Sequence, residues 1–332
     1  MTFPSIYSIS KTLLSLLFAT CLVFVRPSIV LAQEYTEDEY KAFQEIQAEK
    51  DDAKKTALIV KFLKEKPKTA LRKNVTAEFD RVLADLEAAK RWTQMISLGE
   101  KFVDVAPEDS YTVMTLARAY AETKNSKGFA EFGEKAYAQK PSGQLAYAIA
   151  KAYLDLGNDA KFLQWGEKAA AAMPESHEIL FELTRKYGAT QNAATAAKYA
   201  RMCLKALKAA KKPEGTSEQN WKNYTDGAYA VCYAAIGSVA YEGKNYAEAI
   251  ANLDNSVKYI KRNDLAYYYL GMSYWQQNKV DAAMLNLAKA YVLKGSTSPA
   301  AKRYLDQLYR SGHRQSLDGQ DRIIARAEQD LK

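Results

Sequence analysis

Apolar and polar positions follow the period of an α-helix along this chain, and the helical pattern itself recurs every 33 to 34 residues. Three near-copies of one segment, Leu/Ile-x-basic-x-Tyr, lie at 116–120, 149–153 and 183–187. A second echo, Gly-Glu-Lys, begins at Gly99, Gly133 and Gly166. Repetition at this period predicts stacked supersecondary units, each burying its apolar face against the next, rather than one globular core.

The spacing inside the units matches a known pattern. Near the C-terminus, Tyr267, Leu270, Gly271 and Tyr274 are followed by Ala283, Leu287 and Ala290, and related residues stand 34 positions earlier. This arrangement resembles the tetratricopeptide repeat, a pair of antiparallel helices. The resemblance covers most of residues 36–295. It implies an all-α fold, a right-handed α-solenoid of about six to seven helix pairs.

We expect five segments along the chain. They are a signal peptide at 1–32, N-terminal repeats at 33–207, an insertion or extended helix linker at 208–222, two C-terminal repeats at 223–297, and capping helices at 298–332. The insertion is required because Leu183 and Ile236 are 53 residues apart, about 19 more than the period. Either longer flanking helices or a projecting loop would absorb the excess.

Three middle units depart from the family pattern in one way. Large residues stand where a small one is expected, and glycines stand four positions later, where an aromatic is expected: Met95, Phe129 and Phe162, then Gly99, Gly133 and Gly166. Positions four apart share one helical face. The departure therefore exchanges bulk between neighbouring sites and roughly keeps the total volume, a change that cores tolerate.

Residues 1–32 predict a secretory signal peptide that is cleaved after Ala32. Lys11 precedes an uncharged run at 12–25, and small residues stand before the cleavage site. We therefore expect an exported protein, periplasmic or extracellular. The alternative is an uncleaved inner-membrane anchor, although the run is short for a spanning helix and Arg26 interrupts it. A lipoprotein at Cys21 is less favoured, because Thr20 is a poor residue before the cysteine.

Charge and cysteine content add two expectations. The net charge of +8 falls to +6 without the leader, a mild bias toward anionic partners and not a nucleic-acid signature. Cleavage leaves Cys203 and Cys232, which could pair in an oxidising compartment or stay as two buried thiols. Both alternatives stay open, because a disulfide needs a Cα separation that the sequence does not give.

Patterns of catalysis are missing from the sequence. His177 and His313 are the only histidines, and neither lies in a metal-ligand spacing. There is no Cys-x-x-Cys pair, Gly-rich phosphate loop or Gly-x-Ser-x-Gly elbow. We therefore expect a non-enzymatic protein that uses no cofactor and no metal.

The candidate binding residues lie in the middle of the repeated signature. Arg118, Lys151 and Arg185 point away from the apolar sector of their helices, and each shares its face with a large apolar residue four positions earlier: Met114, Tyr147 and Phe181. The resemblance implies that this face forms the inner, concave wall where peptides dock. In the last unit Tyr268 has the equivalent place, with Met272 instead of a cation.

These residues predict a ladder of cations flanked by apolar groups. Arginine suits carboxylate geometry, so the expected ligand is an acidic or C-terminal peptide segment of another protein, with the apolar neighbours supplying most of the affinity. The alternative interpretation is a row of solvated basic residues beside partly packed side chains.

Two further surfaces are candidates. Residues 185–212 hold eight basic and no acidic residues, and five of the basic residues fall on one predicted helical face: Lys198, Arg201, Lys205, Lys208 and Lys212. Such a face could meet an anionic membrane surface or an acidic partner, or it could be a solvated outer face. Tyrosines and tryptophans crowd residues 221–275, mostly at core positions of the family pattern.

Together these patterns predict a protein-binding adaptor or assembly factor of the cell envelope. Two alternatives are kept. One is a membrane-tethered scaffold that retains the leader as an anchor. The other is a binder of cell-wall glycan through the C-terminal aromatic residues.

Overall fold

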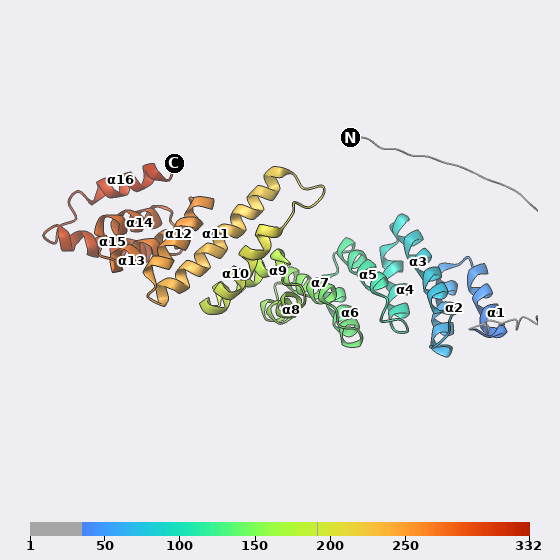
Figure 1. Ribbon diagram of the computed structural model, residues 1–332. Helices are drawn as coiled ribbons and strands as arrows, with labels where there is room; N and C mark the ends of the chain where they lie inside the picture. The colour runs from blue at the N-terminus through green and yellow to red at the C-terminus, as the bar shows by residue number, and fades with distance from the viewer. Residues whose placement is uncertain (1–34, 191) are drawn as a thin grey trace, which may run out of the picture.

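The structure is a computed structural model that describes residues 35–190 and 192–332. Over those residues it holds sixteen helices and no strand (Figure 1), so the all-α prediction is confirmed. In chain order they are α1 (Glu37–Ala48), α2 (Asp52–Glu65), α3 (Arg72–Ala88), α4 (Trp92–Val103), α5 (Ser110–Glu122), α6 (Ser126–Gln139), α7 (Gly143–Asp155), α8 (Asp159–Ala172), α9 (His177–Ala189), α10 (Ala193–Ala209), α11 (Glu218–Glu242), α12 (Tyr246–Tyr259), α13 (Asp264–Gln276), α14 (Val280–Val292), α15 (Ser298–Gly312) and α16 (Gln320–Asp330).

The predicted signal peptide and its alternatives lie outside the described residues. Within 35–190 and 192–332, no helix combines the length and the hydropathy that crossing a bilayer requires.

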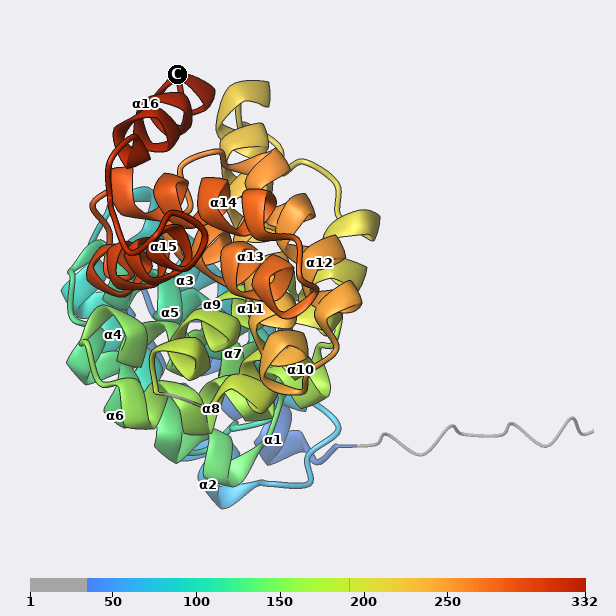
Figure 2. The same cartoon turned by 90° about the vertical axis from the view of Figure 1, so that its left-hand side faces the viewer.

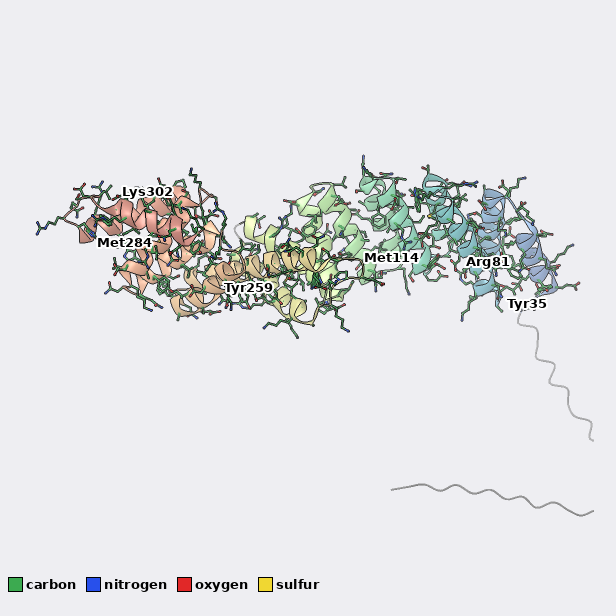
Figure 3. The ribbon with its side chains drawn as sticks, turned by 90° about the horizontal axis from the view of Figure 1, so that it is seen from above. Tyr35, Arg81, Met114, Tyr259, Met284 and Lys302 are labelled. Carbon is green, nitrogen blue, oxygen red and sulfur yellow. The ribbon has the colours of Figure 1, made fainter. Side chains whose placement is uncertain are left out.

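Helices α1 to α14 form seven consecutive pairs, which stack into an elongated solenoid (Figures 1 and 3), seen end-on in Figure 2. The second helix of a pair contacts the first helix of the next, as α10 contacts α11 and α12 contacts α13. First helices also contact one another, α9 with α11 and α11 with α13. The predicted solenoid of six to seven helix pairs is thereby confirmed.

The turn inside a pair has a recurring chemistry. An asparagine side chain begins the second helix by accepting a hydrogen bond from the N–H three residues later, at Asn125, Asn158 and Asn245. The residue just before each asparagine has a positive φ: Lys124, Gly157 and Lys244. The left-handed residue reverses the chain, and the asparagine satisfies a free N–H of the new helix.

The glycines of the middle pairs bring neighbouring pairs together. A Cβ added to Gly99 would lie 2.5 Å from Cδ2 of Leu116, and one added to Gly133 would lie 2.7 Å from Cγ1 of Ile149. Each glycine is on a second helix and its partner is on the first helix of the next pair. The exchange of bulk seen in the sequence therefore makes room for the residue that opens the repeated signature.

The last two pairs use the glycine differently. Gly237 and Gly271 lie on first helices, and a Cβ there would come within 2.6 and 2.7 Å of Cγ of Leu253 and Leu287. These leucines belong to the second helix of the same pair. The contact is thus within a pair, as the tetratricopeptide resemblance implies.

The two sequence echoes are joined by hydrogen bonds. The tyrosine that ends each signature donates to the glutamate of the preceding Gly-Glu-Lys segment, at 2.5, 2.7 and 2.6 Å for Tyr120–Glu100, Tyr153–Glu134 and Tyr187–Glu167. Each bond links a second helix to the first helix of the next pair. Two motifs 20 residues apart therefore form one joint between pairs, made of a glycine contact and a tyrosine–glutamate bond.

Glu134 is the most fully bonded of the three glutamates, and we predict a pH-dependent contribution from it. Partial burial opposes its ionisation, but hydrogen bonds from Lys161 (2.9 Å), Tyr153 (2.7 Å) and Trp165 (3.0 Å) outweigh burial and lower its pKa below the ordinary 4.5. A carboxyl with a lowered pKa in the folded state stabilises the fold above its unfolded pKa, and this contribution is lost as pH falls through the folded pKa.

Glu134→Gln is therefore expected to destabilise the fold by about 1 kcal/mol at pH 7, with the difference from wild type shrinking below pH 4.5. Thermal unfolding of both proteins between pH 3 and 7 measures it. A difference that is constant over this range contradicts the prediction.

Lengthened helices absorb most of the insertion. Helix α11 has 25 residues, whereas α13, which occupies the same place in the next pair, has 13. The connection proper is residues 210–217, so the predicted 208–222 segment includes the end of α10 and the start of α11. We call residues 218–229, which precede the part of α11 that aligns with α13, the α11 extension.

The C-terminal helices cover the end of the array. Helix α15 begins at Ser298 with Pro299 in its first turn, and its Leu305, Leu308 and Tyr309 are buried. Helix α16 returns to pack on α14, where Asp330 pairs with Lys289 at 2.8 Å.

Candidate binding groove

Three cavities adjoin one another along the first helices α5, α7, α9 and α11. The first, of about 230 Å³, is lined by Met114, Tyr147 and Lys151 among others. The second, of about 200 Å³, is again lined by Tyr147 and Lys151 and is closed by Phe181. The third, of about 640 Å³, begins at Arg185, one turn further along α9. We call the three cavities together the groove.

Five of the seven predicted binding residues line the groove: Met114, Tyr147, Lys151, Phe181 and Arg185. The other two do not line these cavities. Arg118 has a side chain that is 64% exposed and reaches toward α3. Tyr268 packs its ring against Tyr304 of α15, with centroids 6.3 Å apart. Tyr268 is partly buried beside this capping helix, and its role in binding stays a prediction.

Two of the three cations of the ladder form ion pairs with glutamates. Arg118 pairs with Glu87 of α3, and Arg185 pairs with Glu182 at 3.1 Å. Lys151 has no ion pair with the described residues and lies 5.9 Å from the ring centre of Tyr147. Exposed pairs of this kind contribute about 0–1 kcal/mol. A carboxylate from a partner could therefore replace either glutamate at little cost.

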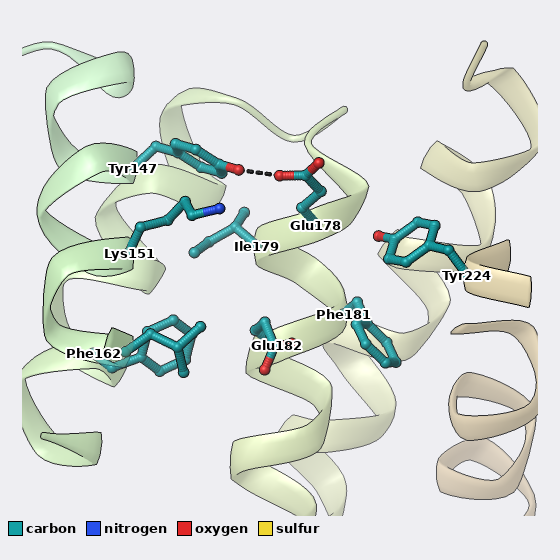
Figure 4. A pocket seen from close by; sticks show the side chains of 9 residues that line it. Tyr147, Lys151, Phe162, Glu178, Ile179, Phe181, Glu182 and Tyr224 are labelled. Carbon is teal, nitrogen blue, oxygen red and sulfur yellow. Dashed lines mark hydrogen bonds between the residues drawn. The ribbon is translucent and has the colours of Figure 1, made fainter. Parts of the chain in front are cut away.

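The second cavity is the most enclosed by aromatic side chains (Figure 4). Tyr147 and Lys151 project from α7, and the Tyr147 hydroxyl donates to Glu178 of α9. On the other side Phe181 meets the ring of Tyr224 edge-on, with centroids 6.1 Å apart. The cavity floor is apolar, and its charged groups stand at the rim.

The α11 extension supplies one wall of this cavity. The ring of its Tyr224 stacks on the ring of Trp221, with centroids 5.6 Å apart. The hydroxyl oxygen of Tyr224 lies 2.8 Å from Nδ1 of His177, within hydrogen-bond distance. Sequence reasoning counted Tyr224 only among the crowded C-terminal aromatic residues, and it did not include His177 or Glu178 among the binding residues. The 53-residue interval between Leu183 and Ile236 was the signal that could have indicated Tyr224. An added helical segment at this place has to pack against the neighbouring helices.

Burial sets the ionisation of these groups. It raises the pKa of Tyr147, with further help from its bond to Glu178, and it raises the pKa of Tyr224. Burial also lowers the pKa of His177, partly opposed by Glu178. At neutral pH the two phenols and the imidazole are therefore uncharged, and the formal charges of the cavity belong to Lys151 and the glutamates.

Small side chains line the third cavity. Its walls include Ala193 and Ala196 of α10 and Ala234 and Ala235 of α11, and Leu265 stands at its edge with 39% of its surface exposed. Because these side chains are small, they leave a space open between the helices.

In comparisons with known proteins, this chain is similar in structure to several solved proteins, but their sequence identity to it is low. No family profile and no curated protein matches the chain. YrrB, described as a TPR protein with an unusual peptide-binding site, is 13% identical over 63% of this chain and 95% of its own, with a TM-score of 0.40. The C-terminal part of a TPR repeat-containing protein from Cytophaga hutchinsonii is 14% identical over 76% of this chain and 93% of its own, also at 0.40.

A third similar structure is the Cut9–Hcn1 hetero-tetramer of the APC/C. It is 15% identical with a TM-score of 0.36, and the match covers 90% of this chain but only 57% of that one. Because these identities and TM-scores are low, the fold is assigned from the seven helix pairs and from the repeated signature in their sequence. The fold is a tetratricopeptide-like solenoid.

Four of the five basic residues that the sequence predicted on one helical face lie on the exposed side of α10: Lys198, Arg201, Lys205 and Lys208. Arg201 approaches Glu248 of α12 at 3.5 Å, and Lys198 lies 5.1 Å from the ring centre of Tyr199. The expectation that Lys212 shares this helical face with Lys205 and Lys208 is wrong, because α10 ends at Ala209. Lys212 instead pairs with Glu218 at the start of α11, at 2.7 Å.

The two cysteines are buried side by side between α10 and α11. Both are free thiols, and a hydrogen bond with Cys203, together with burial, raises the pKa of Cys232. Of the two alternatives from the sequence, the structure has the buried thiols. The raised pKa of Cys232 makes its thiol a poor nucleophile at neutral pH.

Most of the C-terminal aromatic residues pack on one another. Tyr229 stacks on Tyr259 at 4.8 Å, and Trp275 meets Tyr304 at 5.8 Å. Their faces are thus partly occupied by neighbouring rings.

Proposed function

We propose that this protein is a non-enzymatic adaptor or assembly factor that binds peptide segments of partner proteins in the groove. One observation supports this most strongly. Predicted residues in or just before three separate copies of the signature line cavities that follow one another along the first helices, from Met114 to Arg185. A preformed groove lined by apolar side chains with a few charged groups at its rim has the features of a peptide-docking surface.

The proposed ligand is an acidic or C-terminal peptide segment. Its carboxylates would replace Glu87 and Glu182 on Arg118 and Arg185. They would also reach Lys151, which has no ion pair within residues 35–190 and 192–332. Its apolar side chains would enter the cavities and supply most of the affinity. The leader, with its basic residue, apolar run and small residues before the cleavage site, supports the cell envelope as the place of action.

Partner capture tests this proposal. Arg118→Ala/Lys151→Ala/Arg185→Ala is expected to reduce the amount of each specific partner captured from an envelope extract about tenfold at low salt. The matched control, Lys198→Ala/Lys205→Ala/Lys208→Ala, removes three exposed cations of α10 and should capture as wild type does. Equal capture by the two variants would reject the ladder as the binding surface.

A further inference from the structure

The Gly-Glu-Lys echo contains one residue that the joints between pairs do not use. Gly99 admits Leu116, and Glu100 accepts a hydrogen bond from Tyr120. The side chain of the third residue, Lys101, forms no hydrogen bond or ion pair with the described part of the chain. It projects instead from α4 into a cavity on the other layer of helices, away from the groove.

This cavity, of about 440 Å³, lies between the second helices α2 and α4. We call it the outer trough. Part of its lining is apolar and includes the side chains of Ala57, Val60 and Val105. The volume falls in the range of about 300–1,000 Å³ typical of ligand pockets. It is therefore large enough for several side chains of a partner.

The charge of the outer trough is one-sided. Lys61 and Lys64 of α2 and Lys101 of α4 line it, against the single carboxylate of Asp104. Over residues 35–190 and 192–332, none of the three lysines has a carboxylate within 4.0 Å. Like charges gathered around a low-dielectric recess create a positive potential that attracts anions.

The next Gly-Glu-Lys segments show that the arrangement is specific to this place. Lys135 lines an adjoining cavity of about 390 Å³ that shares Lys101 and Asp104, but Glu100 and Glu131 also line it and balance the charge. Lys168 is occupied, with its ammonium 3.9 Å from the ring centre of Trp165. Of these three lysines, only Lys101 therefore lines a cavity in which cations outnumber carboxylates.

From these observations we infer that the outer trough docks an acidic amphipathic helix of a partner protein. Leucine-like side chains of that helix would fill the space over Val60 and Val105, and its carboxylates would pair with the three lysines. A recess with an apolar floor favours a protruding helix over a lipid surface, because a flat bilayer would meet the rim lysines without filling the recess. This interface is separate from the groove and does not depend on it.

A designed peptide tests the inference. The probe is a fluorescein-labelled helix of about 18 residues, five turns, with leucines on one face and glutamates elsewhere. A scrambled peptide of the same composition is its control. Binding to the full chain is followed by fluorescence anisotropy at low salt. Lys61→Glu/Lys64→Glu/Lys101→Glu is expected to weaken binding at least tenfold, and a lysine-for-glutamate version of the peptide should bind this variant better than it binds wild type.

Two comparisons locate the effect. Lys198→Glu/Lys205→Glu/Lys208→Glu changes the net charge equally on α10 and should bind the acidic helix within twofold of wild type. Because the groove is itself proposed to bind acidic peptides, the trough substitutions are also added to Arg118→Ala/Lys151→Ala/Arg185→Ala, where they should still weaken binding at least tenfold. Circular dichroism should show that all variants are folded. The inference is overturned if the scrambled peptide binds equally well, or if the trough variant binds as wild type does. It is also overturned if the trough lysines are needed only for flotation with phosphatidylglycerol vesicles.

Discussion

Replacing Gly99 by alanine is expected to lower the free energy of unfolding by about 1–3 kcal/mol, the usual range for overpacking a core. The new Cβ would lie between 2.5 and 2.9 Å from three atoms of Leu116, a residue with no exposed surface. Chemical denaturation measures the loss. The cause is local, because α4 and the first helix of the next pair have to separate to admit one methyl group.

Gly227→Ala is the matched control, and its effect should have the opposite sign. Gly227 lies inside α11, and a Cβ there meets nothing within 4 Å. Alanine is a better helix former than glycine, so a gain of about 0.5–1 kcal/mol is expected. Combining Gly99→Ala with Leu116→Val should cost less than the sum of the two single changes, because the smaller side chain makes room. Equal losses for both alanine variants would contradict the joint described here.

Removing the aromatic walls of the second cavity should have the largest effect on binding. Phe181→Ala/Tyr224→Ala deletes two rings, one from α9 and one from α11, that meet edge-on at the second cavity with centroids 6.1 Å apart. Buried aromatic anchors often supply 2 kcal/mol or more each, so partner affinity is expected to fall at least tenfold. Titration of a captured partner against both proteins by calorimetry measures the change.

The control for this pair lies outside the groove. Tyr229→Ala/Tyr259→Ala removes a stacked pair at 4.8 Å from α11 and α12. It should leave the affinity for a protein partner within about twofold of wild type. If it weakens binding as much as Phe181→Ala/Tyr224→Ala does, the C-terminal aromatic cluster and not the groove is the binding surface.

The helix pairs and most groove residues could be predicted because both depend on local periodicity. The signature at 116–120 and its copies set the period, and a 100° helical wheel separates Arg118 from Leu116 without further information. The bond between Tyr120 and Glu100 could not be predicted in this way. It depends on the register between two helices of different pairs, which the packing of glycine against leucine decides.

The charge of the groove was predicted only in part. The sequence placed Arg118 and Arg185 on one face, but Glu87 comes from the preceding first helix and Glu182 from the same helix one turn earlier. An ion pair between two helices, such as Arg118 with Glu87, depends on how the helix pairs are arranged in space, and residue spacing within one helix does not predict it. The α11 extension was visible only as 19 surplus residues, and nothing in its own sequence said that Tyr224 would close a cavity on α9.

The most direct test of the groove is crosslinking from inside it. A photoreactive benzoylphenylalanine is placed at Tyr147, at Phe181 or, as a control, at Lys208 on the exposed side of α10. If the groove is the binding surface, a partner in the native compartment crosslinks from the Tyr147 and Phe181 positions and not from the Lys208 position. Crosslinks from Lys208 with none from either groove position would contradict it.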